Sequence, residues 1–284
     1  MKPDITQIDD LVRNLKDRHG DKFGQLRNEA GKFSKFIKAL PGFRIVDPDP
    51  LLFIEHVGRV IVDGVLQVGH DYEKQVRKRV NEISNYQEAV SLSGFRNLLK
   101  RQGISQLLDF DSPKTERDML DVVQYLSDQG LESYSDIRDW LEPEEHRDGL
   151  VSVHSKLGLN TRTPFKVADK TADYFRLLVC HWDAVAVDKG VKSFLAQAEI
   201  VRLNSNKYSY KEKRGIIQLA ALELECRPID LDQSIYRFSF GGLGENSTKT
   251  RGAKPEGTLK YCVECGKKIP RRAKYCPECG TKQV

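Results

Sequence analysis

Residues 165–194 read FKVADKTADYFRLLVCHWDAVAVDKGVKSF and contain two helical patterns separated by a loop. Apolar side chains recur at helical spacing after Lys170, which predicts a helix of about ten residues. The segment HWDAVAVD at 181–188 is expected to form a loop, and a second helix should begin near Lys189. An amine, on Lys170, and a carboxylate, on Asp188, therefore stand at the starts of two consecutive helices.

The same helical spacing recurs on both sides of this stretch, and few segments alternate in the manner of strands. Residues 50–66 form the most apolar of the helical patterns, beginning at Pro50, and are expected to cross the core. Ser112 followed by Pro113 is typical of a helix start. Residues 1–240 are therefore expected to fold as an all-α body.

The composition indicates a soluble globular protein. Of 284 residues, 39% are hydrophobic and 31% are charged, which is enough for a substantial core. No apolar run approaches the roughly 18–20 residues that a membrane span needs, so no membrane interaction is expected. Residues 1–20 are charged throughout and lack the apolar core of a secretory signal, which indicates a cytoplasmic protein. The sequence is silent on oligomeric state, and we expect a monomer.

The net charge of +5 is distributed unevenly. Residues 155–214 contain twelve Lys or Arg against six Asp or Glu, and residues 241–284 contain ten against four. Local basic surface is the electrostatic footprint of a polyanion binder, but solvated faces are often basic as well. Charge alone therefore favours nucleic acid no more than it favours a solvated surface.

The chain ends in a cysteine-rich module. Residues 241–260 are rich in Gly, Ser, Thr and Lys and predict a flexible linker that leads to this module at 261–284. The module has the spacing Cys-x2-Cys-x10-Cys-x2-Cys, and a glycine after each pair lets the backbone fold over the sulfurs. A unit of this size has almost no core, so a bound metal must hold it together. The four cysteines are Cys262, Cys265, Cys276 and Cys279.

Four thiolates suit a closed tetrahedral Zn²⁺ site with a structural role, because no position stays open for catalysis. The spacing resembles that of small zinc ribbons; the alternatives are an iron site of the rubredoxin kind and a tail without metal. Basic residues between the two pairs could contact DNA phosphates, and binding of a protein partner explains them equally. Cys180 and Cys226 lie alone in apolar stretches and are expected to be small core residues. This use of cysteine fits a reducing compartment.

Two short motifs carry a resemblance to a known family. Lys170 begins the tripeptide Lys-Thr-Ala, and Asp188 ends the dipeptide Val-Asp. This arrangement resembles the helix-hairpin-helix DNA glycosylase superfamily, in particular its endonuclease-III-like glycosylase/lyases. In that family a hairpin ends in Lys-Thr-Ala, a helix follows, and Val-Asp precedes the next helix at the same separation. The resemblance extends more weakly to most of residues 50–240.

The resemblance implies a two-lobed helical body with a cleft between the lobes and a hairpin near residues 157–175. Where the family usually has Gly-Val-Gly, this chain has Lys166, Val167 and Ala168, so both glycines are replaced. Glycine lets hairpin amides approach a DNA phosphate closely, so Ala168 narrows that approach and Lys166 offsets it with charge. The chain also lacks the cysteine loop that holds an iron–sulfur cluster in some members.

The implied activity is that of a DNA glycosylase with lyase activity on abasic sites, acting on a base flipped out of duplex DNA. Asp188 would stabilise the sugar cation that forms as the base leaves. Lys170 would attack C1′ and form a Schiff base, after which β-elimination cuts the strand. The attack requires a neutral amine, which partial burial or the charge of Lys166 would favour. Such a protein would work in base excision DNA repair, in the cytoplasm and associated with the nucleoid.

Further residues are candidates for the same site. We expect Lys166, Val167, Ala168, Thr171, Gln67 and Lys189 to contact DNA, with Gln67 filling the gap left by the flipped base. Gln67 could equally be an ordinary polar residue at the end of a helix. Three aromatic side chains near Lys170 and Asp188 could line a base pocket, and they could equally be residues of the core or its rim. They are Tyr174, His181 and Trp182.

Other functions remain open at this point. Lys170 could bind phosphate only, which would leave a monofunctional glycosylase that uses water, and Asp188 could serve only as a helix N-cap. A non-catalytic DNA-binding adaptor would keep the fold and use the zinc ribbon for recruitment, but it would not need both side chains. A metal-dependent nuclease lacks a dense cluster of Asp, Glu and His in the sequence. The identity of the base is not encoded in any motif.

Overall fold

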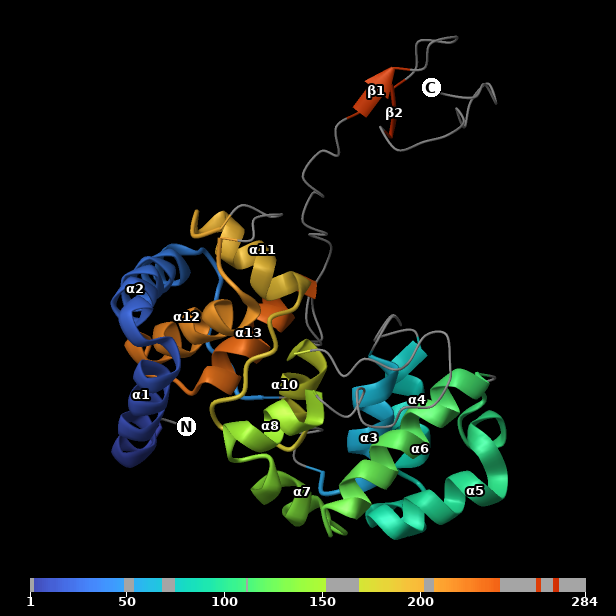
Figure 1. The fold of residues 1–284 in the computed structure, drawn as a ribbon. Helices are drawn as coiled ribbons and strands as arrows, with labels where there is room; N and C mark the ends of the chain where they lie inside the picture. The colour runs from blue at the N-terminus through green and yellow to red at the C-terminus, as the bar shows by residue number, and fades with distance from the viewer. Residues whose placement is uncertain are drawn as a thin grey trace. The chain divides into compact units, whose positions relative to one another are not determined.

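The computed structural model describes residues 3–48, 54–67, 75–110, 112–151, 169–201, 207–240, 259–261 and 268–270. The chain divides into two compact units, Met1–Ser239 and Phe240–Val284. Within the described part of the first unit all regular structure is helical, which confirms the prediction of an all-α body (Figure 1).

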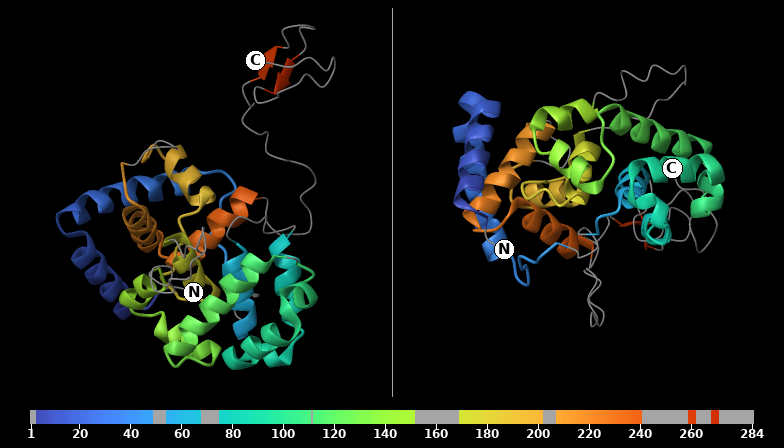
Figure 2. Two further views of the ribbon diagram at one scale, coloured as in Figure 1. Left: turned by 45° about the vertical axis from the view of Figure 1, so that its right-hand side comes forward. Right: turned by 90° about the horizontal axis from the view of Figure 1, so that it is seen from below.

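The N-terminal helices pack on late segments of the body. Helix α1 (Ile5–His19) and helix α2 (Phe23–Ala39) are joined by a short 3-10 turn, and Asp4 begins α1 with a capping box. The apolar stripe of α2 lies along helix α12 (Tyr210–Glu223), and the two run side by side in Figures 1 and 2. Residues far apart in the sequence therefore share one core.

Two large hydrophobic cores, with a smaller third cluster beside them, divide the described part of this unit into two lobes. The first core lies among α3 (Val57–Leu66), α4 (Arg77–Ile83), η4 (Gln87–Val90), α5 (Leu92–Leu108), α6 (Pro113–Asp128), α7 (Tyr134–Trp140), α8 (Glu144–Val151) and α10 (Asp169–Leu178). The second lies among α1, α2, α11 (Lys189–Gln197), α12 and α13 (Pro228–Phe240). The predicted two-lobed body is therefore present in the described residues.

The chain crosses from the first lobe to the second between α10 and α11. Phe175 and Leu178 belong to the first core, whereas Val187 and Val191 belong to the second. The predicted site therefore stands where the two lobes join.

Most predicted helix starts agree with the structure. Ser112 caps α6 and accepts a hydrogen bond from the Thr115 N–H at 3.3 Å, and α11 begins at Lys189. Two predictions are wrong in detail. Helix α10 begins at Asp169 rather than Thr171, and α3 begins at Val57 rather than near residue 50, because the His56 ring accepts from the Arg59 N–H and caps it there.

The second unit contains one described hairpin. Strand β1 (Leu259–Tyr261) pairs antiparallel with β2 (Lys268–Pro270), and Lys260 lies opposite Ile269. Pairing begins at Leu259, inside the segment predicted as linker, since the strand must extend before the first cysteine. None of the helices among the described residues has the length and hydropathy to cross a membrane.

Candidate active site

Lys170 is the second residue of α10, and its side chain is exposed. It makes no hydrogen bond or ion pair with any other residue that the structure describes. Partial burial was one of two expectations for this amine, and the structure instead exposes it in the first turn of the helix; the other expectation was a nearby Lys166 charge. Lys166, Val167 and Ala168, which precede the helix, lie outside the described residues.

Asp188 is the N-cap of α11 and is half-buried. Its Oδ1 accepts a hydrogen bond from the Val191 N–H at 2.9 Å. Asp188 therefore serves as a helix N-cap, the structural role that the sequence left open. The cap uses Oδ1, and Oδ2 accepts no hydrogen bond within the described ranges. Capping fixes the carboxylate while one oxygen remains for chemistry.

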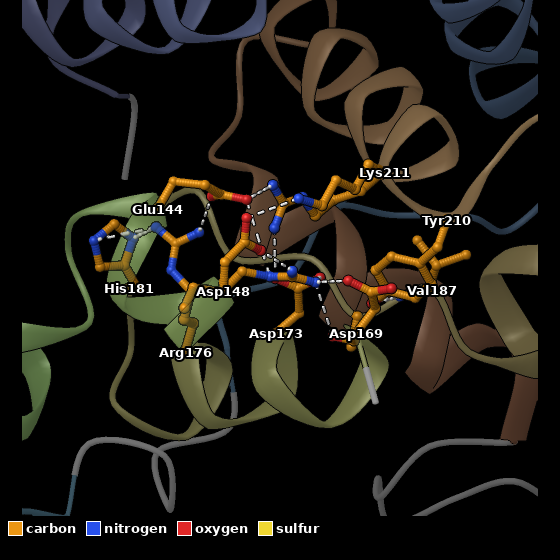
Figure 3. A network of polar contacts seen from close by, with 12 residues as sticks. Glu144, Asp148, Asp169, Asp173, Arg176, His181, Val187, Tyr210 and Lys211 are labelled. Atoms are coloured by element: carbon orange, nitrogen blue, oxygen red, sulfur yellow. Dashed lines mark hydrogen bonds and ion pairs between the residues drawn. The ribbon is translucent and has the colours of Figure 1, made fainter. Parts of the chain in front are cut away.

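A partly buried tyrosine, Tyr210, contacts both the residue before Asp188 and a residue one turn after Lys170. The Tyr210 hydroxyl oxygen accepts a hydrogen bond at 3.1 Å from the N–H of Val187, the residue before Asp188. The same hydroxyl lies close to Asp173, one turn after Lys170 on α10, and burial together with the Asp173 charge raises the pKa of Tyr210 well above its ordinary value. Figure 3 shows Asp173, Tyr210 and Val187 in one polar network.

Asp173 is held as an anion by two arginines. Its carboxylate accepts hydrogen bonds from the Arg147 Nε at 3.0 Å and the Arg147 Nη2 at 3.1 Å, and from the Arg214 Nη1 at 2.6 Å. Burial alone would raise the pKa of Asp173, but the charges of Arg214 and Arg147 outweigh it and lower the pKa. All three side chains are fully buried. Because Arg147 is on α8 and Arg214 on α12, this network joins the two lobes.

A second buried acid holds the loop from α13. The Asp232 Oδ1 accepts a hydrogen bond from the Ala186 N–H at 3.1 Å. Burial, followed by the negative charge of Asp188, raises the pKa of Asp232 well above its ordinary value. Asp232 is therefore harder to ionise than an ordinary aspartate, and it lies near Asp188.

His181 and Trp182 have structural partners. Asp183 accepts from the Arg176 Nη2 at 2.8 Å and contacts the His181 Nδ1, and His181 is buried. Figure 3 shows Arg176 beside His181. Trp182 packs against the second core, and its carbonyl accepts from the Ile229 N–H at 3.3 Å. These contacts give both residues places in the core, the alternative that the sequence analysis kept open.

Gln67 and Tyr174 meet at one buried carboxylate. Gln67 forms the C-cap of α3, and its Nε2 donates to the Asp63 Oδ1 at 3.3 Å. The Tyr174 hydroxyl donates to the same oxygen at 3.4 Å. A predicted wedge residue and a predicted pocket residue therefore lie together. Of the other predicted DNA contacts, Thr171 is buried and Lys189 is exposed.

Sequence reasoning missed the buried polar residues that organise the site. Their signal is a charged or polar residue within an otherwise apolar helical stretch, which marks a buried group that needs partners. Asp63 interrupts VGRVIVDGVL, and Arg214 precedes GIIQLAALE. The sequence does not say which distant residue satisfies each of them. The missed residues are Asp63, Arg147, Asp173, Tyr210, Arg214 and Asp232.

The predicted metal ligands cannot be placed in the same way. Cys262, Cys265, Cys276 and Cys279 lie outside the described residues. Elsewhere, in the parts of the chain that the structure does describe, no group of three or more His, Cys, Asp or Glu side chains is arranged to hold a metal ion.

The C-terminal module matches a known family of domains. Residues 261–283 match the family model of the zinc-ribbon domain. The chain is also similar to two structures from Methanocaldococcus jannaschii, each at 14% sequence identity. One is 8-oxoguanine DNA glycosylase, with a TM-score of 0.44, covering 83% of this chain and 96% of that one. The other is 8-oxoguanine glycosylase/lyase in complex with a 15mer DNA containing 8-oxoguanine, with a TM-score of 0.43, covering 83% and 98%.

No curated protein matches the chain. Because both TM-scores are below 0.5, we infer the activity from the residues of this chain rather than from these two proteins.

Proposed function

We propose that this protein is a DNA glycosylase of the helix-hairpin-helix type that removes a damaged or modified base flipped out of duplex DNA. The observation that carries the proposal is the Tyr210 hydroxyl, which bonds the residue before Asp188 and lies beside Asp173, one turn from Lys170. An amine and a carboxylate on two adjoining helix starts suit a reaction at one deoxyribose. The Lys-Thr-Ala and Val-Asp motifs support the same assignment.

In the proposed reaction Asp188 acts as the base leaves. The C1′–N bond breaks, its electron pair departs with the base, and the sugar gains oxocarbenium character. The unoccupied Oδ2 of Asp188 stabilises that positive charge. The carboxylate is ready before the reaction because its other oxygen is fixed by the helix cap.

Lys170 then acts as the nucleophile. Its neutral amine forms a bond to C1′, and loss of a proton from nitrogen with opening of the sugar ring gives a Schiff base. The Schiff base acidifies the C2′ proton, and its removal expels the 3′ phosphate by β-elimination. The proposed enzyme is therefore both a DNA N-glycosylase and a lyase.

DNA contacts are proposed at the same helix starts. The exposed Lys189 and the N-terminal N–H groups of α10 and α11 suit phosphate, since helix N-termini attract anions. We assign Gln67 to the space left by the flipped base and Tyr174 to the pocket beside it, because both contact Asp63. The remaining proposed contacts are Lys166, Val167, Ala168 and Thr171.

The C-terminal module is proposed to bind one structural Zn²⁺ through Cys262, Cys265, Cys276 and Cys279. Its match to the zinc-ribbon family and its β1–β2 hairpin support this assignment. Four thiolates close the coordination sphere, so the ion would fold the module and would take no part in base excision.

Borohydride trapping tests the lyase. Wild-type protein is incubated with duplex DNA that carries an abasic site, and the reduced covalent adduct is measured. The adduct should be lost in Lys170→Ala and retained in the control Lys100→Ala, since Lys100 is an exposed lysine on α5 outside the site. An adduct that survives Lys170→Ala would contradict the Schiff base assignment.

A monofunctional glycosylase is the second candidate, because an exposed lysine at a helix start also suits a contact with DNA phosphate. Base release that survives Lys170→Ala but not Asp188→Asn would establish it. Tight DNA binding without release of any base from a panel of oxidised, alkylated and mismatched bases would instead indicate a non-catalytic adaptor.

A further inference from the structure

The segment that leads to Asp188 is buried but belongs to no helix or strand. Ala184, Val185, Ala186 and Val187 are each at most 4% exposed. A buried N–H without a partner costs about 1–3 kcal/mol, so each N–H here needs an acceptor. Two of them find acceptors on side chains from other helices: Ala186 donates to Asp232 on α13, and Val187 donates to Tyr210 on α12.

These two hydrogen bonds constrain Asp188 more strongly than the cap alone. The cap fixes the Asp188 side chain relative to α11. The N–H groups of the two preceding residues are each held from a different helix, Ala186 from α13 and Val187 from α12. The Asp188 N–H turns back to the Ala186 carbonyl at 2.7 Å. The direction in which the carboxylate leaves the loop is thus set from inside the protein.

We propose that Tyr210 and Asp232 are positioning residues for base release: by holding the N–H groups of Val187 and Ala186, they aim the Asp188 carboxylate at the deoxyribose. This inference rests on the proposed function. Neither residue touches substrate in it; both act through the loop. Arg147 and Arg214 extend the support, since they hold the Asp173 carboxylate that lies beside the Tyr210 hydroxyl.

The contact of Asp232 with the loop depends on one oxygen, the Oδ1 that accepts from the Ala186 N–H at 3.1 Å. A carboxyl group and an amide have nearly the same shape, and both offer an oxygen to that N–H. Asparagine at position 232 should therefore preserve the positioning, whereas leucine should abolish it.

Matched variants separate positioning from general packing. Tyr210→Phe removes only the hydroxyl that Val187 uses. The control is Tyr208→Phe: Tyr208 is a buried tyrosine of the same lobe, and its hydroxyl donates to Glu29 at 3.0 Å, away from the loop. For Asp232, leucine is compared with asparagine. Thermal unfolding of each variant is measured alongside activity.

Two readouts are taken with enzyme in excess of DNA. The first is the single-turnover rate of base release from the duplex that the wild type processes fastest among oxidised, alkylated and mismatched bases. The second is borohydride trapping on an abasic-site duplex, which reports Lys170. We expect Tyr210→Phe and Asp232→Leu to slow base release about tenfold or more, because both substitutions displace Asp188. The yield of trapped adduct should fall far less, because it depends on Lys170. Tyr208→Phe and Asp232→Asn should stay near the wild type.

Equal rates for Tyr210→Phe and Tyr208→Phe would overturn the inference, as would equal losses of base release and trapping. If Asp232→Leu does not fold, the inference is tested by comparing Tyr210→Phe with Tyr208→Phe and by the rate of Asp232→Asn. A wild-type protein that releases no base from any duplex would overturn the proposed function itself, which distinguishes the two failures.

Discussion

At the scale of single residues, Asp188 caps α11 through one carboxylate oxygen, and we propose that the other oxygen serves the reaction. The sequence alone presents these two uses as alternatives. The positions of Lys170 and Asp188 at helix starts were predictable, because apolar periodicity and capping preferences are local signals. Tyr210 and Asp232 were not, because their partners are backbone N–H groups distant in sequence, and only the packing of α12 and α13 brings them to the loop.

Glu212 provides a residue-scale prediction of pH dependence. Burial opposes ionisation of this side chain, but Lys22 at 2.7 Å and the Ser209 N–H lower its pKa to about 2. A lowered folded-state pKa stabilises the protein above the unfolded value, and the stabilisation is lost as the pH falls from about 4.5 to about 2.

Glu212→Gln should therefore lower the free energy of unfolding by about 2 kcal/mol at pH 7, and the difference should shrink below pH 4.5. Urea unfolding at a series of pH values measures it. Glu145→Gln, at an exposed position in the first turn of α8, is the control and should show little change at any pH. A Glu212→Gln effect that is the same at pH 7 and pH 3 would contradict the assignment.

At the scale of elements, the close packing of α3 on α10 sets the position of the helix that carries Lys170. The apolar character of α3 was evident from the sequence, but its start was not, since the cap at His56 is an uncommon one. The partner of α3 could not be predicted either, because an all-round apolar helix gives no preferred face. The contact depends on Gly64, which lies against the ring of Phe175.

Gly64→Ala should destabilise the protein by about 1–3 kcal/mol, because a Cβ there would lie 2.5 Å from the Phe175 Cζ in a fully buried site. Gly24→Ala is the matched control: it lies in α2 with nothing within 4 Å of the added carbon, so helix propensity should leave it neutral or slightly stabilising. Thermal unfolding compares the two.

Adding Phe175→Leu to Gly64→Ala should recover part of the loss, since leucine leaves room for the methyl group. A destabilisation of equal size at Gly64 and Gly24 would show that the α3–α10 contact is not tight.

At the scale of the whole molecule, the sequence located the two units because composition changes sharply after the helical body. Strand β1 begins at Leu259, within the segment predicted as a linker, and residues 241–258 of that segment lie outside the described residues. The division of the body into two lobes came from a resemblance rather than from periodicity, because periodicity shows that a helix has an apolar face but not which core receives it. The second lobe combines helices from both ends of the body, α1 and α2 with α11–α13, whereas the first is built from the continuous run α3–α10.

The zinc ribbon leads to a prediction about metal content. Purified protein should contain one Zn²⁺ per chain by elemental analysis, and Cys276→Ser should reduce this sharply, because three thiolates bind more weakly than four. Cys226→Ser, which alters a buried cysteine in the helical body, is the control and should retain the metal. Equal zinc content in the two variants would contradict the four-cysteine site.

The central claim is that Asp188 stabilises the departing-base transition state, and its most direct test is single-turnover base release by Asp188→Asn. Asparagine caps helices as well as aspartate, so the fold should be kept while the charge is lost. The account predicts a rate lower by about 100-fold or more, with unchanged unfolding. The matched control, Asp4→Asn at the cap of α1, should keep the wild-type rate. An Asp188→Asn protein that releases base as fast as the wild type would contradict the account.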